Sequence, residues 1–253
     1  DNDRKYLYLT GCLLSFYQQV KLFNVKKEAL IPYNIEDPLL VFVGNRVTAT
    51  TSKDELTDVE EVLTFLDSFV RRRRETSARI GYILEGNTGL IDSRGNDLFA
   101  DKFYGLNEIF GSNTDAEKVY DDMLRLVFNA DTGAEQPRLH LENIKQISGE
   151  IGLKVGNSAD FFGVISIGDT SGLMKNCALK GIDCRTEEFV SESLFRDINK
   201  KDSKIKVLIG SRKFTEGWNS WRVSTMGLIN FAKGEGSQAI QLFGRGVRLK
   251  GYN

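Results

Sequence analysis

The chain has 253 residues, of which 41% are hydrophobic and 27% are charged, and its formal net charge is −1. This composition is typical of a soluble globular protein, and the near-neutral charge excludes a general electrostatic attraction to nucleic acid, so any such contact must be local. No run approaches the roughly 18 apolar residues of a membrane span, and residues 1–4 neither form a signal peptide nor begin with Met. We therefore expect a piece of a longer cytoplasmic protein, without a membrane partner.

The first part of the sequence predicts two helices and two strands. Residues 4–25 carry apolar side chains at helical spacing, and an extended linker follows them. Residues 39–43 form a short, continuous apolar run, which favours a strand buried on both faces. A helix over residues 54–74 and a strand over residues 80–84 complete this part.

The rest of the sequence predicts an insertion, followed by further strands and helices. Residues 85–160 contain frequent Gly and Asn and only short apolar runs, and within them residues 150–155 alternate like an exposed strand. Beyond this insertion the predicted elements are buried strands at 161–167, 206–209 and 226–230, and helices at 189–199 and from Ser237. Strands that alternate with helices predict an α/β fold with a parallel sheet flanked by helices.

Cysteine and histidine are too sparse for a structural zinc site. Cys12, Cys177 and Cys184 show no C-x-x-C spacing, and His140 is the only histidine. Such a site usually needs four Cys or His ligands. We expect no metal ligands in this chain and free, buried thiols in a reducing cytoplasm.

The segment 237–250 holds the residues with the most specific chemistry. Ser237 is a favourable helix N-cap, and on the helix that follows it Gln241, Arg245 and Arg248 lie within roughly 60° of one another. Apolar side chains cover the opposite side. Guanidinium groups stay charged at cellular pH and suit phosphate oxygens, so a phosphate site is one interpretation and a solvated basic face is the other.

The pattern Q-x-x-G-R-x-x-R in this segment resembles the sixth motif of superfamily 2 helicases and translocases. In that family the two arginines reach the γ-phosphate of ATP held by another RecA-like domain. The resemblance therefore implies that Arg245 and Arg248 are arginine fingers. It places Gln241 and Gly244 beside the nucleotide.

Two strand ends carry residues that this resemblance assigns to the nucleic-acid backbone. The strand at 206–209 runs into a polar loop, and α/β folds build ligand sites at such carboxyl ends. The loop is similar to helicase motif V, where Ser211 takes the place of a phosphate-contacting Thr and is followed by Arg212 and Lys213. The strand at 39–43 resembles motif IV, and it ends in Asn45 and Arg46, which would face the backbone.

The far end of the motif V segment is expected to face ATP. Gly217 takes the place of the motif's Gly, and Asn219 takes that of the Asp which meets the ribose. Glu216 stands where the motif has Arg, which leaves a structural hydrogen bond and an ATP-linked role both open. The Glu and the Trp218-Asn219 pair depart from common helicases but resemble the restriction (Res) subunit of type III restriction enzymes.

The resemblance implies that residues 1–253 form the second, C-terminal RecA-like domain of such an enzyme, with a P-loop NTPase-like fold that lacks the P-loop. Neither G-x-x-x-x-G-K-[ST] nor D-E-x-[DH] occurs in the sequence. ATP with Mg²⁺ would be bound mainly by an N-terminal RecA-like domain of the same protein, and this piece alone would be inactive. DNA, double- or single-stranded, and a methyltransferase subunit are the other implied partners. The alternative is a non-catalytic nucleic-acid-binding or scaffold module of RecA-like ancestry.

Two further features have both a structural and a functional interpretation. The four arginines at 71–74 close a predicted helix, where cations favour the helix dipole, and they could instead contact backbone phosphates. Trp218 and Trp221 fit a core or an interface, and they could instead stack on bases.

Overall fold

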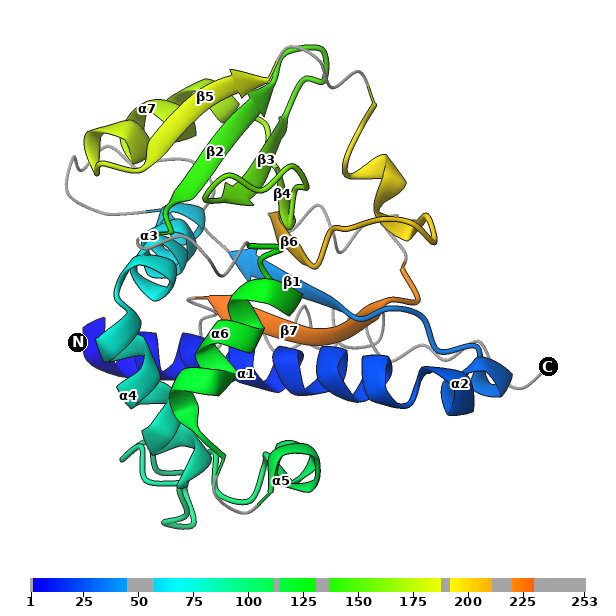
Figure 1. The fold of residues 1–253 in the computed structure, drawn as a ribbon. Coiled ribbons are helices and arrows are strands. Elements are labelled where there is room, and N and C mark those ends of the chain that lie inside the picture. The colour runs from blue at the N-terminus through cyan, green and yellow to red at the C-terminus, as the bar shows by residue number, and fades with distance from the viewer. Residues whose placement is uncertain are drawn as a thin grey trace.

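The computed structural model describes residues 2–44, 57–111, 114–130, 137–187, 192–210 and 220–229 (Figure 1). The α-helices in these ranges are α1 (Asn2–Val25), α2 (Lys27–Leu30), α3 (Asp58–Arg71), α4 (Arg73–Leu84), α5 (Tyr104–Phe110), α6 (Ala116–Leu126) and α7 (Thr170–Leu179). Two 3₁₀ helices, η1 (Ile31–Tyr33) and η2 (Arg196–Asn199), accompany them. The strands are β1 (Leu39–Gly44), β2 (Leu139–Ile144), β3 (Glu150–Val155), β4 (Gly163–Ser166), β5 (Asp183–Glu187), β6 (Val207–Gly210) and β7 (Val223–Ile229).

These strands form one mixed, mostly parallel sheet in the order β5-β2-β3-β4-β6-β1-β7. Strand β3 runs antiparallel to its neighbours β2 and β4, and the other pairings are parallel. The strands β4, β6, β1 and β7 are therefore adjacent, and all four point the same way. Their carboxyl ends meet at one edge of the sheet.

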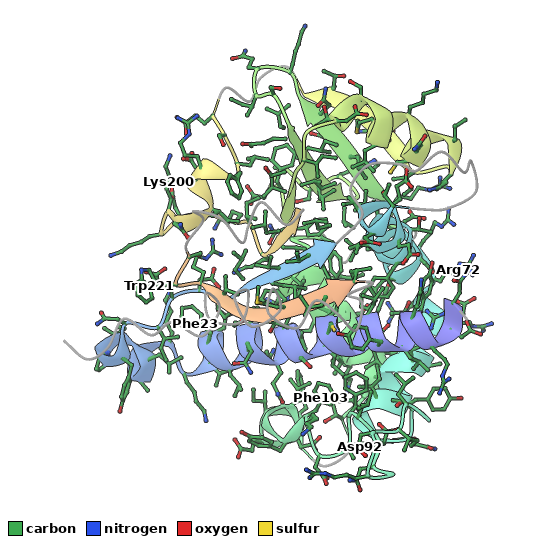
Figure 2. All side chains as sticks on the ribbon, turned by 180° about the vertical axis from the view of Figure 1, so that it is seen from behind. Phe23, Arg72, Asp92, Phe103, Lys200 and Trp221 are labelled. Atoms are coloured by element: carbon green, nitrogen blue, oxygen red, sulfur yellow. The ribbon has the colours of Figure 1, made fainter. Side chains whose placement is uncertain are left out.

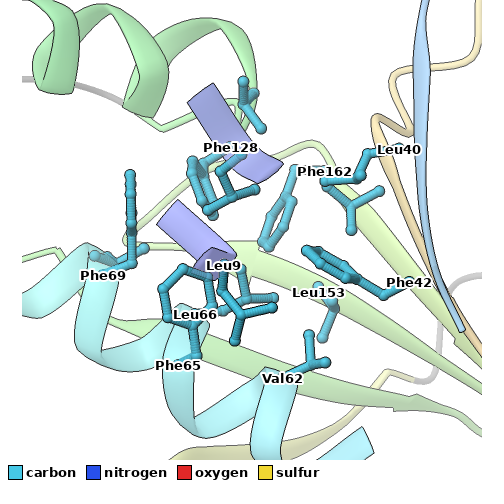
Figure 3. Close-up of a cluster of buried hydrophobic side chains, with 14 of the residues drawn as sticks. Leu9, Leu40, Phe42, Val62, Phe65, Leu66, Phe69, Phe128, Leu153 and Phe162 are labelled. Carbon is cyan, nitrogen blue, oxygen red and sulfur yellow. The ribbon is translucent and has the colours of Figure 1, made fainter. Parts of the chain in front are cut away.

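The two faces of the sheet carry separate apolar clusters, because successive residues of a strand point to opposite sides. On one face, Phe42 of β1 belongs to a cluster that receives side chains from α1, α3, α4 and α6 (Figure 3). In it Phe128 packs on Phe69 of α3 and on Phe162, with ring centroids 5.4 and 4.9 Å apart. On the other face, Val41 packs in a second cluster that includes Ile198 of η2.

Most of the predicted elements are confirmed. The helix predicted at 4–25 is α1, and the strands predicted at 39–43, 161–167, 206–209 and 226–230 are β1, β4, β6 and β7. The α/β class with a largely parallel sheet flanked by helices is confirmed as well. Although α1 has 24 residues, no helix in the described ranges combines the length and the apolar character that crossing a membrane requires.

The strand predicted at 80–84 is wrong, and the helix predicted at 54–74 is interrupted. The chain leaves helical geometry at Arg72, with φ −105° and ψ 67°, so that α3 ends at Arg71 and α4 continues to Leu84. In α4 the buried residues Ile80 and Ile83 are three positions apart, as on one face of a helix. A five-residue apolar run is too short to distinguish a strand from such a helix face.

The predicted insertion 85–160 supplies α5, α6, β2 and β3. The expectation that residues 150–155 form an exposed strand is wrong in its exposure, because β3 lies between β2 and β4 and is buried along most of its length. The described part of the helix predicted at 189–199 contains only the 3₁₀ helix η2. The helix predicted from Ser237 lies outside the described residues.

The segment that follows α4 packs on α1 at a glycine, where Phe99 lies against the helix backbone. Gly11 lies inside α1, and a Cβ atom added there would lie 2.1 Å from Cζ of Phe99. We expect Gly11→Ala to lower the free energy of unfolding by about 1–3 kcal/mol, because the ring must be displaced from its packed position. Urea denaturation of the variant measures this loss.

The matched control for this prediction is Gly81→Ala. Gly81 also lies in a helix, but the nearest atom to an added Cβ is 3.9 Å away, on Ala116. Alanine at this site should stabilise the protein by up to about 1 kcal/mol through helix propensity alone. Equal stability of the Gly11→Ala and Gly81→Ala variants would contradict the packing of Phe99 on α1.

Candidate functional site at the carboxyl edge of the sheet

The carboxyl ends of the four adjacent parallel strands define the candidate site. In the sheet register Gly210 of β6 lies opposite both Val43 of β1 and Ser166 of β4, and Gly44 lies opposite Ile229 of β7. Figure 1 shows β1 and β7 side by side with their arrowheads at the same side of the molecule. In parallel α/β sheets this edge is the usual place for ligands, because the loops that leave it converge.

Every predicted site residue lies outside the described residues, and the structure therefore brings none of them together directly. Asn45 and Arg46 follow β1 in sequence, and Ser211, Arg212 and Lys213 follow β6. Glu216, Gly217 and Asn219 precede the described Ser220. The residues that come after β7 are Gln241, Gly244, Arg245 and Arg248. The strand ends from which these segments leave are, however, described. They are neighbours at one edge.

The amino end of α3 lies against the end of β1. A Cβ atom on Gly44 would lie 2.5 Å from Cβ of Asp58, the first residue of α3. The helix begins with a capping box, in which Glu60 N donates to Thr57 Oγ1 at 3.2 Å and Thr57 N donates to a Glu60 carboxylate oxygen at 2.9 Å. The sequence T-x-x-E is a known start signal, so it could have placed this helix start more accurately. It brings the positive end of a helix dipole to the edge.

Glu60 also ties α7 to this helix start. The Nδ2 atom of Asn176 donates to Glu60 Oε1 at 2.7 Å, and the Lys180 ammonium lies 3.5 Å from Oε2. Burial alone raises the pKa of the Glu60 carboxyl, but the Thr57 N–H, the Asn176 amide and Lys180 outweigh it, so the pKa is lowered. The carboxylate stays charged, with only 4% of its side chain exposed. Sequence reasoning missed this network because its members are far apart in the chain.

At the opposite, amino edge of the sheet a buried arginine joins the starts of the same strands. The Nε atom of Arg222 donates to the carbonyl oxygen of Asp37 at 2.8 Å, and its Nη2 atom donates to that of Ile205 at 2.7 Å. Its Nη1 atom donates to the carbonyl of Ile198 in η2. Arg222 directly precedes β7, and its guanidinium binds carbonyl oxygens that lie just before β1 and β6. These hydrogen bonds fix how the three strands align.

Two cations share one carboxylate in this arginine clamp. The Asp37 carboxylate accepts a hydrogen bond from the Lys206 ammonium and lies 3.7 Å from Nη2 of Arg222. Burial lowers the pKa of Lys206 and of Arg222, and Asp37 offsets part of this in both cases. Sequence patterns do not signal a buried arginine, so the clamp was not predicted.

The described residues offer a framework rather than a reaction centre. No group of three metal-ligating side chains occurs among them, and the three cysteines are free thiols. Burial raises the pKa of Cys12 to about 11 and that of Cys177 to about 12, so both thiols stay protonated. Cys12 and Cys177 are buried, as predicted, whereas Cys184 is only partly buried. The Nδ1 atom of His140 lies 2.8 Å from Asp183 Oδ2, which accounts for the single histidine as an ion-pair or hydrogen-bond partner within the sheet.

Comparisons of the chain with protein-family models, with curated proteins and with solved structures find no match.

Proposed function

We propose that the chain is the C-terminal RecA-like motor domain of an ATP-dependent DNA helicase or translocase. The observation that supports this most is the topology of β6, β1 and β7, which are adjacent and parallel. The segments that resemble motifs IV and V begin where β1 and β6 end, and the motif VI segment follows β7 in sequence. A fold that starts all three segments from one edge can aim them at a common ligand.

In this proposal the chain completes an ATP site that another domain begins. ATP with Mg²⁺ is bound mainly by an N-terminal RecA-like domain of the same protein. Arg245 and Arg248 neutralise the charge that develops on the γ-phosphate, and Gln241 and Gly244 pack beside them. Gly217 and Asn219 face the nucleotide, and Glu216 supports that loop.

The nucleic-acid contacts are proposed for the loops that begin at the same edge. Ser211, Arg212 and Lys213 after β6, with Asn45 and Arg46 after β1, grip the DNA backbone without reading bases. Hydrolysis of ATP opens and closes the cleft between the two domains and so moves the DNA. Within this class we propose the restriction subunit of a type III restriction–modification system, which works with a methyltransferase subunit and an endonuclease domain.

The rival function, a scaffold module without an ATP role, makes a different prediction for the arginines. A scaffold needs no arginine finger, so removal of Arg245 or Arg248 would leave any ATP turnover of the full-length protein unchanged. ATP turnover of these variants, considered in the Discussion, is therefore the experiment that tests the proposed function.

The DNA contact is tested separately with the double variant Arg212→Ala/Lys213→Ala. Each neutralised phosphate adds about 0.7–0.9 to the slope of log affinity against log salt, so we expect the slope to fall by about 1–2 units. All DNA sequences should weaken alike, because backbone contacts carry no base information. Fluorescence anisotropy with labelled duplexes of different sequence, titrated over a range of salt, measures both effects.

A matched control is Lys26→Ala/Lys27→Ala, which removes an adjacent exposed basic pair near the end of α1. It changes the net charge by the same amount but lies outside the proposed DNA path. An unchanged slope in a folded Arg212→Ala/Lys213→Ala protein would remove these residues from the path.

A further inference from the structure

An arginine cluster lies where α3 meets α4, at the end of α3 that is away from β1. Arg71 and Arg72 end α3, Arg79 lies in α4, and Arg138 directly precedes β2. Arg71, Arg72 and Arg138 all act electrostatically on Asp67, and Arg72 and Arg79 act on Tyr6. Figure 2 shows Arg72 beside the start of α1, on the side away from Lys200 and Trp221. We call these four residues, grouped around Asp67 and Tyr6, the arginine patch.

The patch holds more positive charge than its own neighbours neutralise. Asp67 interacts with three of its arginines, and it forms an ion pair with Arg71, whose Nε atom lies 3.6 Å from Oδ2. Arg79 lies over the ring of Tyr6, 5.3 Å from its centroid. Arg72 and Arg138 are exposed, and neither guanidinium makes a hydrogen bond or an ion pair with any residue in the described ranges. Like charges grouped around a single carboxylate repel one another, so a ligand that supplies negative charge would relieve the group.

Stabilisation of a helix end does not account for these charges. Only Arg71 lies in the last turn of α3, where a cation favours the dipole. Because Arg72 breaks the helix, Arg73 and Arg74 stand at the amino end of α4, where positive charge is unfavourable. The prediction that all four arginines close one helix is therefore wrong. Arg73 is compensated by Asp121 and Glu117 of α6.

We propose that the arginine patch is a second binding surface for a nucleic-acid backbone, separate from the loops at the carboxyl edge. Guanidinium forks bind phosphate oxygens in a bidentate manner and remain charged at any cellular pH. The four members of the patch are guanidinium groups beside the partly buried Tyr6, a composition that suits phosphate oxygens better than the apolar core of a protein interface. The choice of DNA as the ligand rests on the proposed function, whereas the position of the surface rests on the arginines alone.

The patch and the candidate site are separated by the length of α3. Helix α3 begins with Asp58 against the end of β1, and its 14 residues span about 21 Å before Arg71. At a rise of about 3.4 Å per base pair, this length corresponds to about six base pairs of duplex. A duplex that contacts both surfaces is therefore held at two separated places along its backbone.

The double variant Arg72→Ala/Arg138→Ala tests the patch. Anisotropy with a mixed-sequence duplex of about 30 base pairs, titrated from about 50 to 200 mM salt, should give a slope lower by about 1–2 units than for the unmodified chain. Arg72→Lys/Arg138→Lys should keep most of the slope, because it preserves the charge. Arg185→Ala/Arg196→Ala removes two other exposed arginines as the matched control, and its slope should stay within the error of the unmodified chain.

Several results would overturn this inference. One is an unchanged salt slope of DNA binding in the folded Arg72→Ala/Arg138→Ala variant, and another is an equal fall of the slope in Arg185→Ala/Arg196→Ala. A third is that polyglutamate of matched charge competes for the chain as well as DNA does. If the patch variant keeps its slope while Arg212→Ala/Lys213→Ala loses it, the patch is wrong and the proposed function stands. The opposite pattern supports the patch and contradicts the loop contacts. No DNA binding by the unmodified chain would contradict both.

Discussion

Replacing Arg245 or Arg248 by alanine is expected to lower the ATP turnover of the full-length protein by about 10³-fold or more, the scale of an arginine finger. The guanidinium would act on charge that develops only in the transition state, so its loss should reduce kcat. The affinity for ATP should change far less, because the phosphate-binding loop would belong to the other domain. Phosphate release at saturating DNA gives kcat, and titration with a fluorescent ATP analogue gives Kd.

Two variants make the result specific to the proposed role. Lys250→Ala removes a cation from the same predicted helix but outside the Q-x-x-G-R-x-x-R pattern, so turnover should stay near that of the unmodified protein. Arg245→Lys keeps a charge but loses the planar fork, and it should lose most of the activity. Turnover within about tenfold of normal in Arg245→Ala would make that arginine a surface charge and favour the scaffold alternative.

The sequence predicted β1, β4, β6 and β7 because buried parallel strands leave a simple pattern, whereas β2 and β5 were not predicted. Residues 39–43 and 206–209 are continuous apolar runs, and they become β1 and β6, buried on both faces of the sheet. Ile80 and Ile83 carry the same kinds of side chain, but tertiary packing against α6 and α1 selects the helix there. Only the three-residue spacing of the buried side chains distinguishes a helix from a strand here. A run of five residues is too short to show that spacing repeatedly.

Only part of the candidate site could be predicted from the sequence. The prediction that polar segments follow buried strands depends on local sequence, and the described strand ends are consistent with it at Gly44 and Gly210. The contacts between distant segments could not be predicted, because no local pattern encodes them. Glu60 can contact Asn176 and Lys180 only when α7 packs on α3. Arg222 can donate to its three carbonyl oxygens only when the strands are aligned.

The second large effect is expected at the arginine clamp of the amino edge. Arg222→Met should lower the free energy of unfolding by about 3–5 kcal/mol, the range for removing one member of a buried charged network. The side chain is only 3% exposed, and its removal would leave the carbonyl oxygens of Ile198, Ile205 and Asp37 without these donors. Methionine fills a similar volume, so the loss reports the hydrogen bonds rather than a cavity. Urea denaturation measures it.

The controls separate charge from geometry at this position. Arg222→Lys keeps a cation near Asp37 but cannot donate to all three carbonyls at once, so an intermediate loss is expected. Arg185→Met, at an exposed arginine of the edge strand β5, should change stability by no more than about 0.5 kcal/mol. A loss below about 1 kcal/mol in Arg222→Met would mean that water replaces the donors and that the clamp does not hold the strands. Because β6 has only four residues, the alignment fixed at its amino end also sets where its carboxyl end, Gly210, lies at the candidate site.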